Sequence, residues 1–102
     1  MAEWKPEDVQ QGILITLYKE YMQDCRRPVV FSKEGLKEDD PPFNDVYREV
    51  KQLEHWGWLE ICGGMMGAVL CRLTLEGRDV FEKMLGEETE LRSRPPIGYK
   101  VE

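Results

Sequence analysis

Apolar residues recur at steps of three or four positions in two parts of the chain. The first stripe is Val9, Ile13, Leu17 and Tyr21, and the second is Val46, Val50 and Leu53. Because an α-helix has about 3.6 residues per turn, residues at these spacings lie on one face of a helix. The pattern therefore predicts amphipathic helices over residues 6–23, where Pro6 suits the first turn, and over about 42–55.

The segment between these helices is short and interrupted. Residues 28–31 are branched and aromatic, which favours a small strand. Ser32 can cap a short second helix over residues 33–38, in which Leu36 faces inward, and the Asp39-Asp40-Pro41-Pro42 run must end it. The next helix can begin with Asp40 as its cap and Pro41 in its first turn, or with Asn44 as its cap, and the sequence favours neither.

After Gly57 the apolar period changes from 3.6 to two, which indicates strands. Residues 58–62 and 68–73 alternate around the glycine-rich run GGMMG, so a β-hairpin with a loose tip is predicted. Thr74 is a suitable cap for a last helix over residues 75–85, which Gly86 ends. The fold class is therefore α+β, with one domain over residues 1–86 and an extended or disordered C-terminal tail over 87–102.

Charge and composition narrow the choice of function. Fourteen Lys and Arg against twenty Asp and Glu give a net charge of -6, so this acidic protein has no overall positive field, and nucleic acid must be met by a local patch. We expect a cytoplasmic location, because the N-terminus lacks the features of a signal peptide and no stretch reaches membrane-spanning length. The three cysteines and single histidine lack metal-site spacing, and no catalytic motif is present, so we expect no metal, no cofactor and no enzyme activity.

Two motifs carry a resemblance to a known family. The run VYREVKQLEHWGWLE at residues 46–60 resembles the junction between recognition helix and wing in PadR-like winged-helix regulators. The run RLTLEGR at residues 72–78 resembles the strand-to-helix junction of the same family. The resemblance implies a winged helix-turn-helix with a three-helix core, a β-hairpin wing and a C-terminal helix, and a homodimeric transcription regulator that binds double-stranded DNA. The chain departs from the family in its proline-rich DDPPFND segment and in a wing tip without Lys or Arg.

The resemblance also suggests which residues would contact DNA. On the outer face of the 42–55 helix, Asn44 and Arg48 would read base edges, while Tyr47 and Lys51 would hold phosphates. Lys33 of the short second helix would hold a further phosphate. Four polar residues at helical spacing are also what any solvent-exposed helix face carries. A second hypothesis is therefore a winged-helix module that binds a partner protein rather than DNA, through Met65 and Met66 of the wing or through the tail.

Overall fold

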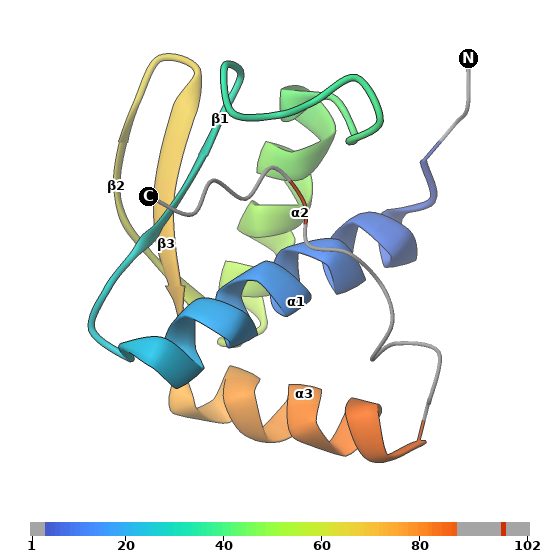
Figure 1. Cartoon of the computed structure of the whole chain (residues 1–102), viewed down its shortest axis with the longest axis vertical. Coiled ribbons are helices and arrows are strands. Elements are labelled where there is room, and N and C mark those ends of the chain that lie inside the picture. Colours follow the sequence, from blue (N-terminus) through green and yellow to red (C-terminus); the bar gives the residue numbers. More distant parts are fainter. Residues whose placement is uncertain (1–3, 88–96, 98–102) are drawn as a thin grey trace.

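The computed structural model describes residues 4–87 and residue 97 of the chain. Within these residues, helices and strands follow one another in the order shown in Figure 1. They are α1 (Pro6–Gln23), β1 (Val29–Ser32), α2 (Phe43–His55), β2 (Leu59–Met65), β3 (Ala68–Leu73) and α3 (Leu75–Glu87). Helix α1 packs against α2, β3 and α3, so it lies at the centre of the fold. The helices predicted over 6–23 and 42–55 are confirmed to within one residue.

The three strands form one antiparallel sheet in the order β1-β3-β2. Val29 faces Cys71 across the β1–β3 pair, and Leu59 faces Leu73 across the β2–β3 pair. The register of β2 shifts between Ile61 and Gly63, so Cys62 is an extra residue on that strand. The predicted strand before Ser32 and the predicted hairpin are both confirmed.

The hairpin is longer and its tip tighter than the glycine run suggested. Gly63, Gly64 and Met65 belong to β2 and pair with β3, so that only Met66 and Gly67 form the turn. Gly67 has a φ of 80°, a conformation that glycine adopts without a steric penalty. The expectation of a loose tip was therefore wrong.

The predicted short helix over residues 33–38 is absent, and this segment consists of turns. The side-chain oxygen of Ser32 accepts a hydrogen bond from the Gly35 amide at 3.0 Å, as a cap would. The turn does not continue, because Gly35 disfavours a helix, and because Asp40 Oδ2 instead accepts the amide of Lys37 at 2.9 Å. The three-helix core expected before the hairpin thus contains only two helices among the described residues.

The ends of the two later helices differ slightly from the predictions. Pro42 stands at the N-cap position of α2, where its carbonyl accepts the amides of Asp45 and Val46, and no described side chain caps the helix. Neither Asp40 nor Asn44 is therefore the cap. The cap on α3 is confirmed, since Thr74 Oγ1 accepts the Gly77 amide at 3.0 Å, but α3 continues past Gly86 to Glu87.

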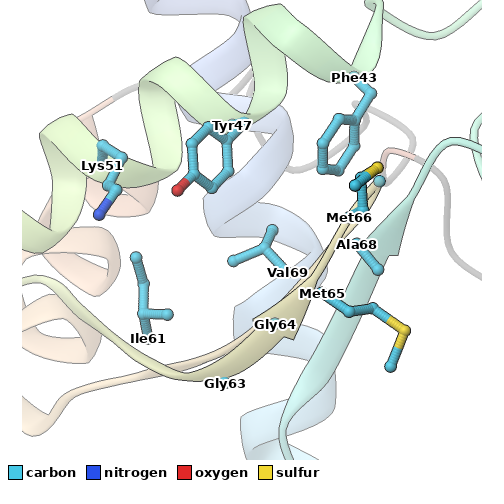
Figure 2. A pocket seen from close by; sticks show the side chains of 11 residues that line it. Phe43, Tyr47, Lys51, Ile61, Gly63, Gly64, Met65, Met66, Ala68 and Val69 are labelled. Atoms are coloured by element: carbon cyan, nitrogen blue, oxygen red, sulfur yellow. The ribbon is translucent and has the colours of Figure 1, made fainter.

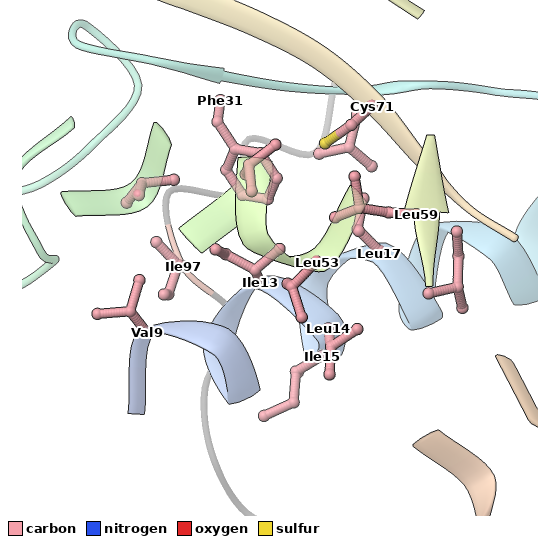
Figure 3. Close-up of a cluster of buried hydrophobic side chains, with 14 of the residues drawn as sticks. Val9, Ile13, Leu14, Ile15, Leu17, Phe31, Leu53, Leu59, Cys71 and Ile97 are labelled. Carbon is pink, nitrogen blue, oxygen red and sulfur yellow. The ribbon is translucent and has the colours of Figure 1, made fainter. Parts of the chain in front are cut away.

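The core gathers α1, in which every residue from Gly12 to Leu17 is buried, the inner faces of the sheet and α2, and Phe81 of α3. Figure 3 shows part of this core. Ile97 also belongs to this core and is 5% exposed, although it lies in the segment expected to be a tail. Its amide donates to Thr16 Oγ1 at 2.9 Å. The rest of the predicted tail beyond Glu87 lies outside the described residues. In the part of the chain that is described, no helix is long and apolar enough to cross a membrane.

Candidate functional site on helix α2 and the hairpin

Helix α2 presents the face that its periodicity predicts. Val46, Val50 and Leu53 have no exposed surface and fix the inner side of the helix. The predicted contact residues on the opposite side are all exposed, and they are Asn44, Tyr47, Arg48 and Lys51. The outward orientation of this face is therefore confirmed, while any role in DNA binding stays a prediction.

Arg48 is held by acidic neighbours on its own helix. Its Nε lies 3.1 Å from Glu49 Oε2, and its Nη2 lies 3.5 Å from Asp45 Oδ1. Glu49 is buried, and its other carboxylate oxygen accepts a hydrogen bond from the Gln10 side chain at 2.9 Å. Two carboxylates of the same helix therefore offset the positive charge of Arg48.

Tyr47 and Lys51 lie on the other shoulder of α2, together with Phe43. The rings of Phe43 and Tyr47 stack with their centroids 6.0 Å apart. The Lys51 ammonium lies 5.7 Å from the centre of the Tyr47 ring, within the range of a cation–π contact. These three side chains follow one another at steps of four residues, so they form one continuous row along the helix.

This row forms one wall of an open groove of about 480 Å³ between α2 and the hairpin (Figure 2). Lys51 and Ile61 lie toward one end, Tyr47 and Val69 lie in the middle, and Phe43 lies near the hairpin tip. The remaining lining residues are Gly63, Gly64, Met65, Met66, Gly67 and Ala68. The groove is thus bounded by aromatic, aliphatic and thioether groups, and Lys51 is the only charged residue among its described lining residues.

The hairpin tip carries the most exposed apolar side chains beside the groove. Met65 is 76% exposed and Met66 is fully exposed. Lys33 lies beside this tip, since its amide donates to the carbonyl of Gly67 at 2.9 Å. The structure therefore places Lys33 next to the hairpin tip rather than on a second helix.

Part of this groove could have been predicted from the sequence, but the predicted DNA contacts did not include it. Phe43 and Ile61 were absent from the predicted site, although Phe43 stands four residues before Tyr47 on the same helical row. The contribution of Ile61, Val69 and the glycines depends on how the hairpin packs beside α2. Helical periodicity does not contain that information.

No family model matches the chain, and neither a curated protein nor a solved structure does. Within residues 4–87 and 97, no group of three or more His, Cys, Asp or Glu side chains is arranged to hold a metal ion.

Proposed function

We propose that the chain is a winged-helix-type interaction module that binds a partner protein in the groove between α2 and the hairpin. The observation that carries this proposal is the groove itself, an open apolar surface beside a fully exposed methionine. Exposed apolar surface next to a concave site is typical of protein-binding faces. Methionine side chains adapt their shape to a partner at little steric cost.

The arrangement of elements supports the winged-helix part of the proposal. The chain order α1-β1-α2-β2-β3-α3 and the strand order β1-β3-β2 are compatible with a winged-helix layout in which turns replace the second helix. In such a layout α2 takes the place of the recognition helix and the β2–β3 hairpin that of the wing. The groove then lies between the two elements that this fold commonly uses for binding.

Charge favours protein over DNA as the partner. Binding to the DNA backbone depends on cations that displace condensed counterions, and each missing cation weakens it. Here the net charge is -6, Arg48 is paired with two carboxylates, and the hairpin tip carries no Lys or Arg. An apolar groove gives no favourable contact to a hydrated phosphate, whereas it suits an apolar side chain.

Double-stranded DNA is the second candidate, because Asn44, Lys51 and Lys33 are exposed on or beside this face. Under this proposal the double variant Arg48→Glu/Lys51→Glu would abolish binding to duplex DNA. Because Arg48→Glu also places a third carboxylate beside Asp45 and buried Glu49, circular dichroism checks that the variant remains folded. Fluorescence anisotropy of a labelled random duplex, followed from low to physiological salt, measures the binding directly. Binding that weakens steeply with salt and disappears in the double variant would establish the DNA function.

Photo-crosslinking in the source cells tests the protein-binding proposal. A benzophenone amino acid replaces Met66 in one variant and Lys83, an exposed residue of α3, in the control. We expect a discrete crosslinked protein from position 66, absent from position 83, that is lost when Tyr47→Glu is added to the position-66 variant. Circular dichroism checks that Tyr47→Glu remains folded. The same crosslinking pattern from both positions, or none from position 66, would contradict the proposal, and a product of twice the mass would identify a second copy of the chain.

A further inference from the structure

We propose that the segment bound in this groove is both apolar and acidic, with an aromatic or aliphatic side chain seated beside Tyr47 and a carboxylate on Lys51. This inference rests on the proposed function and adds the chemistry of the partner. The occupant of the groove is a segment of a partner protein. The groove recognises this segment through an apolar side chain and through a negative charge.

The charge of the groove differs from that of the molecule as a whole. The chain carries twenty acidic residues, yet of the eleven described residues that line the groove none is acidic and Lys51 alone is charged. The excess of acidic residues would repel a negatively charged partner over much of the surface, whereas the groove offers it the Lys51 ammonium. Electrostatic complementarity of this kind determines which partner binds and in which register.

Lys51 is also available for a carboxylate. Four arginines of the described chain pair with acids of the chain itself, and they are Arg27, Arg48, Arg72 and Arg78. By contrast, no carboxylate among the described residues lies within ion-pair distance of the Lys51 ammonium, whose nearest recorded partner is the Tyr47 ring. No acid in the described part of the chain therefore offsets the charge of Lys51.

The wall beside Lys51 suits an apolar anchor. The stacked rings of Phe43 and Tyr47 form a flat surface, Ile61 and Val69 lie opposite them, and Gly63 and Gly64 leave the β2 side without bulk (Figure 2). A Cβ at Gly63 would have no atom within 4 Å, so this side of the groove is open. An aromatic ring inserted here would contact aromatic and thioether groups on either side.

Two small molecules test the apolar contact and the charged contact separately. The probes are 3-phenylpropionate and its amide, 3-phenylpropanamide, which share a shape and differ in charge at neutral pH. Methionine methyl groups labelled with ¹³C report the binding site by NMR, because Met65 and Met66 line the groove while Met22 and Met84 lie on α1 and α3. The full chain is used throughout.

We expect both fragments to shift the Met66 methyl signal and to leave those of Met22 and Met84 unchanged. The carboxylate should bind about two- to fivefold more tightly than the amide, which is the factor that an exposed ion pair provides. Lys51→Gln should reduce this ratio to about one while preserving binding of the amide. The matched control Lys83→Gln, on α3, should leave the ratio unchanged.

Each alternative result has a defined meaning. Equal binding of the two fragments, or a ratio unaffected by Lys51→Gln, would overturn the acidic preference and leave the apolar groove and the proposed function standing. No shift of Met66 with either fragment would overturn the groove as a binding site and the proposed function with it. A Met66 shift produced by random duplex DNA at low salt, but not by the carboxylate, would replace the acidic protein segment with nucleic acid.

Discussion

Gly77, in the first turn of α3, lies directly against the backbone of Trp58. A Cβ built on Gly77 would come within 1.8 Å of the Trp58 carbonyl oxygen, and backbone cannot move aside as a side chain can. Gly77→Ala should therefore destabilise the protein by about 1–3 kcal/mol or more, as overpacking does. Thermal unfolding followed by circular dichroism measures this loss.

Gly86 provides the matched control on the same helix. A Cβ at Gly86 has no atom within 4 Å, and the residue lies within α3. Gly86→Ala should raise stability by up to about 1 kcal/mol, because alanine favours the helix. Equal effects at the two positions would contradict the close packing of α3 on the segment after α2.

The three cysteine thiols should differ sharply in reactivity. Cys25 and Cys62 are exposed and Cys71 is buried in the core, and all three are free thiols. Burial, with a smaller contribution from nearby Cys62, raises the pKa of Cys71 to about 12 from its ordinary value of 9.0. Since the thiolate is the reactive form, a chromogenic disulfide reagent should modify two thiols in the native protein and the third only after unfolding. Three thiols reacting at the same rate would contradict the burial of Cys71.

The raised pKa of Cys71 also predicts how stability depends on pH. The folded protein holds this thiol neutral, so its contribution to stability is fully present below the unfolded pKa of 9.0 and is lost as pH rises toward about 12. Chemical denaturation between about pH 8 and about pH 11 should show the decline, and Cys71→Ala should show a smaller one. An identical pH dependence in the two proteins would rule out Cys71 as its source.

At the scale of elements, Thr74 joins the start of α3 to the turn that follows α2. Its hydroxyl accepts the Gly77 amide at 3.0 Å and donates to the Gly57 carbonyl at 2.7 Å. Thr74→Ala should lower stability by about 1–2 kcal/mol, since it removes both the helix cap and the hydrogen bond to Gly57. Thr74→Ser keeps both bonds and should lie close to wild type in the same denaturant titration. If serine is as destabilising as alanine, the hydroxyl is not the cause.

Elements whose signals are local were predictable from the sequence. The stripes of α1 and α2, the alternation of β2 and β3 and the cap at Thr74 each depend on neighbours within a few residues. The structure of the segment after Ser32 was not predictable in this way. The side chains of Ser32 and Asp40 accept hydrogen bonds from the Gly35 and Lys37 amides, and the balance between these bonds and helical ones decides whether the segment forms a helix or a turn. The tight hairpin tip likewise depended on how many glycines pair with β3.

The candidate site likewise has one feature that the sequence predicts and others that it does not. Helical geometry alone predicted that Asn44, Tyr47, Arg48 and Lys51 face outward. It did not predict that Arg48 turns to Asp45 and Glu49 while Tyr47 turns to the hairpin, because those directions depend on side-chain rotamers and on Gln10 of α1. The groove exists only where two elements distant in sequence meet.

At the scale of the whole molecule, a notch on α1 receives a residue from near the other end of the chain. The Thr16 hydroxyl accepts the Ile97 amide at 2.9 Å, and Thr16 is fully buried. A Cβ at Gly12 would lie 2.2 Å from Ile97 Cδ1 and 2.4 Å from Ile97 Cγ1, but 3.7 Å from Ile97 Cβ. The absence of a side chain at Gly12 therefore makes room for the outer atoms of Ile97 and not for its Cβ.

This geometry predicts that the effect of Gly12→Ala on stability has opposite signs in the wild-type chain and in the Ile97→Ala chain. In the wild-type chain, Gly12→Ala should be destabilising by about 1–3 kcal/mol, because the new methyl overlaps Ile97. In the Ile97→Ala chain, the overlapping atoms are gone and the remaining Cβ is at ordinary contact distance, so Gly12→Ala should instead stabilise α1 by up to about 1 kcal/mol. Denaturant unfolding of the four proteins forms a double-mutant cycle that isolates this coupling. If Gly12→Ala has the same effect in both backgrounds, Ile97 does not occupy the notch in solution, because only contact between the two residues makes their effects depend on each other.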